Sequence, residues 1–225
     1  MHRAIVPDNL KGMVTAFFTG KAPGADSAAI ASMLMIRKEQ VYLPLQKHTD
    51  KVLILESSLE PKIGDAIITR EKGILIGVQV ADCVPILLYD RKQKIAGAVH
   101  AGWRGTAASI LKRTIETMNE RFLSEPADIM VAIGPSIRAC CYEVGCDVFN
   151  AVISAAGEVQ IHRIIGEKHY VDLSAANNHQ ALSMGIPGQN IRVSEECTFC
   201  SPDKFFSYRF SKGSTGRQGG FIGIF

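Results

Sequence analysis

Three residues of types that bind metal ions lie beside segments with strand-like composition. His48 follows a short apolar stretch, Cys83 lies inside a long apolar run, and His100 ends another. A thiolate and two imidazoles together suit zinc. Three protein ligands leave a fourth tetrahedral position open, which is typical of catalytic zinc sites. The spacing alone favours the alternative that His48 is a surface histidine and Cys83 a core thiol, so the metal site needs support from beyond the spacing.

Cys83 and His100 are expected on neighbouring antiparallel strands. The polar segment between their two apolar runs has the composition of a turn. A turn centred on Arg91 and Lys92 would bring Cys83 near His100, because hairpin register follows from the position of the turn. A bend at Pro85 would absorb the inexact register. The sequence therefore predicts proximity of the two side chains and sets no distance.

Two charged residues flank these ligands. Asp82 precedes Cys83, and in a regular strand its side chain would point to the opposite face. It is a candidate catalytic acid or, equally, a supporting carboxylate. Arg104 follows His100 by four residues at an expected helix start, where backbone N–H groups favour anions. It is a candidate for binding phosphate, and a salt bridge is the alternative.

A third group of candidates follows the turn after a buried strand at 129–133. Cys140, Tyr142 and Glu143 are predicted to line the substrate pocket. Cys197 and Cys200 have Cys-x-x-Cys spacing, which is found in redox and zinc sites. No second pair of this spacing and no thioredoxin-like context accompanies it, so plain buried thiols or a minor local role are predicted.

The elements that must position these residues are mixed strands and helices. An apolar stripe at helical spacing predicts one helix over 107–122, and further helices are expected at 27–36, 146–156 and 174–184. Because strands and helices do not alternate strictly, the predicted fold class is α/β (α+β), a single-domain layered sandwich of mixed β-sheets flanked by helices over residues 1–225. Strands are predicted at Met13–Thr19, Ala66–Thr69, Ile74–Tyr89, Ile95–His100, Ile129–Ile133, Tyr170–Leu173, Ile191–Val193, Phe205–Phe210 and Phe221–Phe225.

Composition excludes several classes of protein. The 225 residues carry a formal charge of +3 and no basic run, so nucleic acid is not an expected partner. No apolar stretch has the length of a membrane helix, and the first residues lack the pattern of a signal peptide. The expected location is the cytoplasm. There the six cysteines are expected to be free thiols or ligands rather than disulfides.

From His48 to the C-terminus the chain resembles the YfiH-like family, also labelled laccase-domain, polyphenol oxidase or purine nucleoside phosphorylase. The resemblance implies a zinc site held by His48, Cys83 and His100. At the first ligand the family usually has Val-His-Gly, whereas this chain has Lys47-His48-Thr49. The matching motifs, in family order and spacing, are Gly64–Ala66 with Thr69, Ala81–Leu88, Val99–Gly105, Ile133–Ile137, Cys140–Gly145, Asp172–Leu173 with Asn178 and Gln180, Cys197–Thr198, Phe206–Arg209 and Gly216–Arg217.

The resemblance also implies a reaction. Family members are expected to cleave adenosine, inosine, guanosine and methylthioadenosine with phosphate, giving the free base and ribose 1-phosphate. Deamination of adenosine to inosine is the associated activity. Zinc can activate water for that deamination while a nearby acid moves protons, and Asp82 is the nearest acid in the sequence. Purine nucleosides and phosphate are thus the expected partners, and the oligomeric state is left open.

Three rival functions remain at this point. A multicopper oxidase needs many histidines, but the chain has six and none in a His-x-His pair. A single copper ion on the same three ligands, with a laccase-like activity, stays open. A cysteine hydrolase or amidase would use Cys83 as nucleophile and His100 as base. A zinc-binding interaction domain would bind the metal without turnover.

Overall fold

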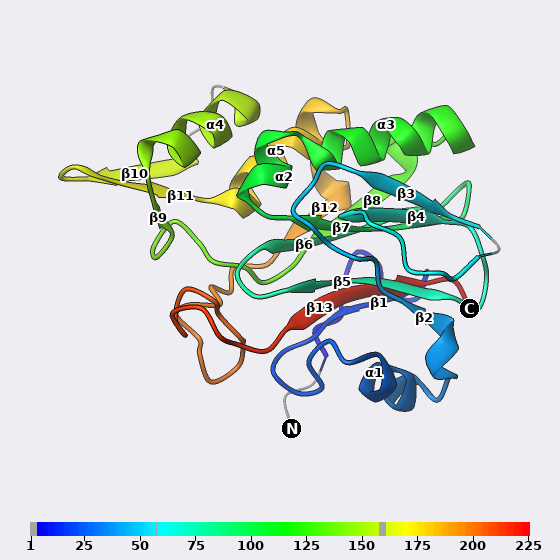
Figure 1. Cartoon of the computed structure of the whole chain (residues 1–225). Coiled ribbons are helices and arrows are strands. Elements are labelled where there is room, and N and C mark those ends of the chain that lie inside the picture. The colour runs from blue at the N-terminus through cyan, green and yellow to red at the C-terminus, as the bar shows by residue number, and fades with distance from the viewer. Residues whose placement is uncertain (1–3, 57, 158–160) are drawn as a thin grey trace.

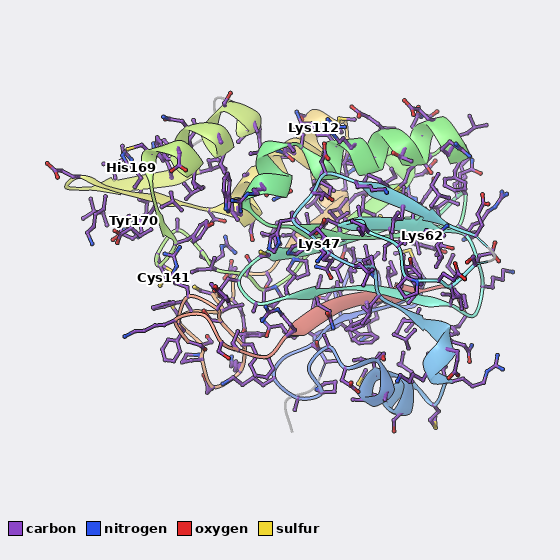
Figure 2. The ribbon with its side chains drawn as sticks, viewed as in Figure 1. Lys47, Lys62, Lys112, Cys141, His169 and Tyr170 are labelled. Carbon is purple, nitrogen blue, oxygen red and sulfur yellow. The ribbon has the colours of Figure 1, made fainter. Side chains whose placement is uncertain are left out.

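Two β-sheets are stacked face to face, and helices cover the outer face of each (Figure 1). The computed structural model describes residues 4–56, 58–157 and 161–225. The side chains of the strands fill the space between the layers (Figure 2). The layers run from helices through a six-stranded sheet and a four-stranded sheet to one further helix.

The six-stranded sheet is mixed and has the order β12-β8-β6-β7-β4-β3. Its strands are nearly continuous apolar runs, as expected for a sheet covered on both faces. The bounds are β3 Val52–Leu55, β4 Ala66–Thr69, β6 Val84–Asp90, β7 Ile95–Ala101, β8 Ile129–Ile133 and β12 Ile191–Val193.

The second sheet is four-stranded, with the order β1-β13-β5-β2, and a third, three-stranded sheet projects at one side with the order β10-β11-β9 (Figure 1). The second sheet consists of β1 Thr15–Phe18, β2 Val41–Tyr42, β5 Leu75–Val80 and β13 Gln218–Gly223. The third consists of β9 Glu143–Val144, β10 His162–Ile165 and β11 Lys168–Val171.

Four helices lie on the side of the six-stranded sheet, and α1 lies under the four-stranded sheet (Figure 1). In the described residues, no helix is both long and apolar enough to cross a membrane. The helices are α1 Ser27–Leu34, α2 Trp103–Ala107, α3 Ile110–Phe122, α4 Cys146–Ala156 and α5 Leu173–Ser183, with short 3-10 turns η1 Lys38–Gln40, η2 Pro126–Asp128 and η3 Gly188–Asn190.

Successive side chains of β6 point to opposite faces of the sheet, so this one strand contributes to two hydrophobic cores. Ile86 and Leu88 pack toward the helices, whereas Leu87 and Tyr89 pack toward the four-stranded sheet. These side chains are at most 2% exposed. Burying one such aliphatic side chain stabilises a fold by about 1.5–3 kcal/mol. This double packing fixes the register of β6, and therefore the place where the polar residues before it emerge.

The predicted fold class is confirmed: the chain has mixed α/β content in layered sheets flanked by helices. Several elements have the predicted bounds, namely β4, β8, β12 and α4. The predicted run at 74–89 is wrong as one strand. It divides into β5 and β6, and the turn Ala81–Cys83 carries the chain from one sheet to the other. Asp82 lies in this turn with φ +89°, so no strand alternation relates it to Cys83.

The β6–β7 hairpin turns one residue later than predicted. Asp90 pairs with Ile95, which places His100 opposite Pro85. The buried Asp90 carboxylate accepts hydrogen bonds from the backbone N–H groups of Lys92 and Gln93, at 2.8 and 2.9 Å. These bonds hold the turn one position further along the chain. The prediction that the hairpin brings Cys83 near His100 holds despite the shifted register.

Two other predicted elements differ. The helix predicted over 107–122 is divided, because Ser109 adopts a left-handed conformation between α2 and α3. Gln180 donates to the Thr106 carbonyl at the break, at 2.9 Å. The strand predicted at 205–210 is a series of turns whose backbone hydrogen bonds are local, such as Ser211 N–H to the Ser207 carbonyl at 3.0 Å.

Candidate metal centre

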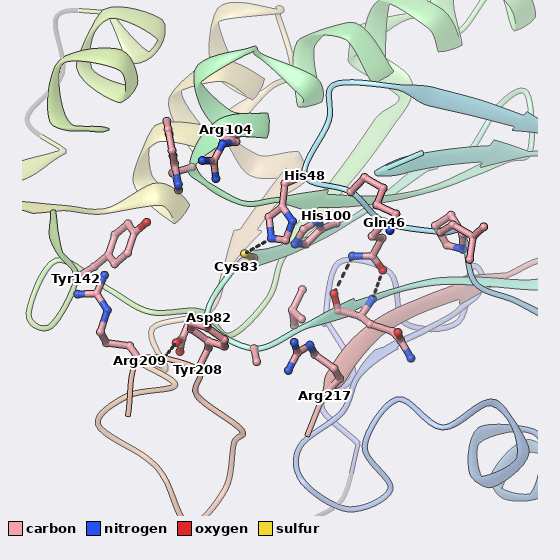
Figure 3. A pocket seen from close by; sticks show the side chains of 17 residues that line it. Gln46, His48, Asp82, Cys83, His100, Arg104, Tyr142, Tyr208, Arg209 and Arg217 are labelled. Carbon is pink, nitrogen blue, oxygen red and sulfur yellow. Dashed lines mark hydrogen bonds between the residues drawn. The ribbon is translucent and has the colours of Figure 1, made fainter. Parts of the chain in front are cut away.

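His48, Cys83 and His100 come together at one point of the fold (Figure 3). Their ligand atoms all lie within 4.8 Å of one another, and Cys83 Sγ is 3.9 Å from His48 Nε2. His48 lies in the loop between β2 and β3, Cys83 immediately precedes β6, and His100 is near the end of β7. Three segments from both halves of the sandwich thus meet in the arrangement predicted for a metal site.

The ligands lie in the wall of a pocket of about 710 Å³, a size typical of small-molecule sites. Four cationic side chains and one carboxylate line it, together with three aromatic side chains. The cations are Lys47, Arg104, Arg209 and Arg217, the carboxylate is Asp82, and the aromatics are Trp103, Tyr142 and Tyr208. The pocket is therefore electropositive and offers flat apolar faces beside the ligand cluster.

One buried carboxylate, Asp65, orients two of the three ligands. It is fully buried before β4 and accepts a hydrogen bond from His100 Nδ1 at 2.8 Å. The backbone N–H of His48 donates to the same oxygen at 3.0 Å. The other oxygen accepts from the Lys47 and Thr49 N–H groups and from the Thr49 hydroxyl. Asp65 thus fixes the loop that carries His48 and leaves His100 Nε2 free to bind a metal ion.

The electrostatics of the cluster couple Cys83 to His100. Burial lowers the pKa of His100, but the Cys83 charge and the hydrogen bond to Asp65 raise it to about 9, so a metal ion that binds His100 displaces a proton. Burial raises the pKa of the Cys83 thiol, but the charge of His100 and hydrogen bonds from His100 and His48 lower it to about 6. Cys83 is therefore a thiolate at neutral pH, the form that binds metal ions. Burial raises the pKa of Asp65, but hydrogen bonds from His100, Thr49 and Lys47 hold it well below its usual range. Asp65 is thus a charged partner for His100.

The donor set fits zinc. Tetrahedral zinc with bonds of about 2.0–2.3 Å separates a thiolate sulfur from an imidazole nitrogen by about 3.5 Å. The 3.9 Å between Cys83 and His48 is within a few tenths of an ångström of that value. A Cβ added at Gly102 would lie 3.0 Å from Cys83 Sγ and 3.1 Å from His48 Cδ2. Glycine at this position therefore keeps the space between the ligands free.

Asp82 and Arg104 both line the pocket but have different surroundings. The Asp82 carboxylate accepts hydrogen bonds from the Thr198 hydroxyl at 2.6 Å and from the Arg209 N–H at 2.7 Å. Both of its oxygens are engaged, which suits an anchoring role. The Arg104 guanidinium lies 4.3 Å from the Trp103 ring, and among the described residues it makes no salt bridge. Arg104 is thus available to an anionic ligand.

The three predicted substrate residues occupy different places. Tyr142 lines the pocket. Glu143 lines a neighbouring, more open depression and pairs with Lys168 at 3.0 Å. Cys140 is not among the residues that line either cavity, because its thiol faces Cys200 at 3.7 Å.

Sequence reasoning missed several residues of the site. Asp65 was part of a family motif but received no role, although a charged residue directly before a fully apolar strand is a usable signal. Tyr208, Arg209 and Arg217 come from the C-terminal segment, whose path over the pocket no periodicity indicates. In Figure 3 Arg104, Tyr142 and Arg217 approach the ligand cluster from different sides.

The fold and the site define an α+β sandwich protein with a His-Cys-His cluster in an electropositive pocket. Residues 24–225 match the family model described as multi-copper polyphenol oxidoreductase laccase, and the chain belongs to that family.

Two relatives of this chain are named for activities on purine nucleosides. A purine nucleoside phosphorylase of Clostridium acetobutylicum is 41% identical over 79% of this chain and 74% of the relative. An adenosine deaminase from an unknown prokaryotic organism is 35% identical over 87% of this chain and 79% of the relative. The crystal structure of YlmD from Geobacillus stearothermophilus has a TM-score of 0.90, with 30% identity over 97% of this chain and 94% of that one.

Proposed function

We propose that the protein is a zinc-dependent purine nucleoside phosphorylase that also deaminates adenosine. The observation that carries the proposal is the His48, Cys83 and His100 cluster inside an electropositive pocket of nucleoside size. The names of curated relatives, purine nucleoside phosphorylase and adenosine deaminase, support the same substrates. Adenosine, inosine, guanosine and methylthioadenosine are the proposed nucleosides, and phosphate is the second substrate.

Zinc held by the three ligands would supply a Lewis acid and lower the pKa of water at its open position to about 7. The surrounding residues have roles of their own. Arg104 and Arg217 would hold phosphate, since guanidinium groups pair with phosphate oxygens in a bidentate manner. Trp103 and Tyr208 would offer apolar faces to the purine.

In phosphorolysis a phosphate oxygen forms a bond to ribose C1′ while the bond from C1′ to the purine nitrogen breaks. The electron pair of the broken bond leaves with the base, which then takes up a proton. Burial raises the pKa of Tyr142, and the nearby Cys83 charge raises it further, to about 12. The phenol therefore stays protonated at neutral pH and can donate a hydrogen bond to the substrate. Asp82 would act mainly by anchoring the turn that carries Cys83.

The histidine inventory argues against a multicopper centre. Six histidines without a His-x-His pair cannot supply one. In the described residues only two groups of three or more potential ligands occur, and one of them contains no histidine.

Incubating the protein with adenosine, with and without phosphate, tests the proposed reaction. Adenine and ribose 1-phosphate that form only with phosphate would support phosphorolysis. Inosine would support deamination, and the absence of both would contradict the proposal.

Replacing Arg104 by alanine is expected to raise the KM for phosphate by about tenfold or more. A hydrogen bond to a charged group contributes about 1.5–3 kcal/mol. Zinc content should not change, because Arg104 is no ligand. Arg163→Ala, an exposed substitution on β10, is the matched control. Steady-state kinetics with phosphate varied measure the effect, and an unchanged KM for phosphate would assign Arg104 no part in binding it.

A further inference from the structure

Four cysteine side chains gather at a second point, in two loops far apart in the sequence. Cys140 and Cys141 follow β8, and Cys197 and Cys200 follow β12. Their sulfur atoms all lie within 4.8 Å of one another, with Cys141 Sγ 3.2 Å and Cys140 Sγ 3.7 Å from Cys200 Sγ. Figure 2 labels Cys141 in its loop beside the orange C-terminal segment. All four are free thiols.

The separations match those of a tetrathiolate metal site. Zinc–sulfur bonds of about 2.3 Å in a tetrahedron place neighbouring sulfur atoms about 3.8 Å apart. The Cys140–Cys200 separation of 3.7 Å is close to that value, and the Cys141–Cys200 separation of 3.2 Å is shorter by a few tenths of an ångström. Cys197 and Cys200 have the Cys-x-x-Cys spacing common in structural zinc sites. Cys140 and Cys200 are exposed, so a metal ion can reach the cluster from solvent.

The pKa of Cys197 and those of Cys140 and Cys141 shift in opposite directions. Burial raises the pKa of Cys197, but backbone hydrogen bonds at Arg138 and Cys200 lower it, and its pKa lies below the ordinary value. Burial and the neighbouring thiols raise the pKa of Cys140 to about 11. The grouping of the four sulfur atoms, rather than their titration, is the observation that indicates a metal site.

We infer that Cys140, Cys141, Cys197 and Cys200 bind a second zinc ion in a closed, structural site separate from His48, Cys83 and His100. Four protein ligands fill a tetrahedral coordination sphere and leave no position for a substrate. An all-thiolate set selects zinc over magnesium, calcium or manganese.

The second site would stabilise the pocket through the two loops that carry the four cysteines, although the cysteines themselves do not line the pocket. Tyr142, which lines the pocket, directly follows Cys141. Thr198 lies between Cys197 and Cys200, and its hydroxyl donates to Asp82 in the turn that carries Cys83. The Thr198 N–H also donates to the Ser136 carbonyl at 3.1 Å, which joins the two loops. A metal ion at the cluster would thus fix both loops relative to the first site.

Metal analysis of the purified full chain tests this inference. The protein is prepared with zinc and a reductant, and zinc and iron are measured per chain. We expect two zinc ions in the wild type, one in Cys197→Ser and in Cys200→Ser, and two in the control Cys146→Ser, which removes an exposed cysteine outside the cluster. His48→Ala should keep the zinc of the four-cysteine site. A wild-type zinc content that Cys197→Ser and Cys200→Ser do not lower, or iron in place of the second zinc ion, would overturn the assignment.

A second measurement does not depend on the variants being folded. In the wild type, zinc should protect the four cluster cysteines from alkylation, while Cys146 reacts freely. Peptide mass spectrometry reads each cysteine separately. Equal alkylation of all five with and without zinc, or recovery of Cys141 and Cys200 as a disulfide from reduced preparations, would contradict a metal site. Neither result bears on purine turnover. The four-cysteine site can therefore be wrong while the proposed phosphorylase function is right, and the reverse also holds.

Discussion

Replacing Cys83 by serine is expected to remove the zinc ion of the first site and lower adenosine turnover by more than about 100-fold. Loss of an outer partner of a metal ligand already costs 10–100-fold in affinity or activity, and loss of the ligand itself should cost more. Serine is nearly isosteric, so the fold should be retained. Zinc in the four-cysteine site should remain. Metal content and turnover are measured on the same preparation, with Cys146→Ser as the control.

A second variant, His48→Ala, addresses the strongest rival. Because the pKa of Cys83 is about 6, its thiolate could also serve as a nucleophile with His100 as base. Such a thiol enzyme does not need His48. The metal account therefore expects His48→Ala to lose the same zinc ion and the same turnover as Cys83→Ser. Wild-type turnover in a His48→Ala protein that lacks this zinc ion would favour the thiol enzyme.

Replacing Asp65 by asparagine is the second substitution with a large expected effect. The amide nitrogen of asparagine cannot accept hydrogen bonds, so part of the set from His48, Thr49 and His100 is lost. Zinc affinity should fall by about 10–100-fold. The free energy of unfolding of the zinc-free protein should fall by about 3 kcal/mol, because the lost bonds end on a buried charge. Zinc titration and urea denaturation measure the two effects.

The pH dependence of the Asp65→Asn effect has a definite sign. The pKa of Asp65 is depressed in the folded protein, so its stabilisation is fully present above the unfolded value of about 3.9. It is lost as the pH falls through the folded pKa. The stability difference from wild type should thus shrink in acid. Because Asp65 also raises the pKa of His100 to about 9, the difference should shrink again as the pH rises from about 6.5 through that value. Asp50→Asn, a substitution of a half-buried carboxylate in the same loop that pairs with Arg113, is the control, and an equal effect of both would contradict the role of Asp65.

The parts of the fold that the sequence predicts well have strong periodicity or clear ends. The apolar strand at 129–133 and the helix at 146–156 have the predicted bounds for this reason. The run at 74–89 failed as a single strand because both halves are buried on both faces, so no change of pattern marks the crossing between sheets. The left-handed Ser109 that divides the 107–122 helix likewise has no local signal.

The candidate metal ligands are a different case. Residue type and a family resemblance pointed to them, and geometry then brought them together. The departure at Lys47 and Thr49 has a physical explanation, since Asp65 binds the backbone N–H groups of this loop, which any residue except proline supplies. The four-cysteine cluster was not predictable, because one of its halves is an adjacent pair rather than a second Cys-x-x-Cys. Only the loops after β8 and β12 join the halves.

The most direct test of the account is removal and return of zinc at the His48, Cys83 and His100 site. The wild-type protein is treated with a chelator until this zinc ion is lost, its fold is verified by circular dichroism, and adenosine and phosphate are added. Adenine, ribose 1-phosphate and inosine are separated by chromatography before and after zinc is returned. The account predicts that turnover disappears with the zinc ion and returns in proportion to it. Unchanged turnover by folded protein without this zinc ion would contradict it.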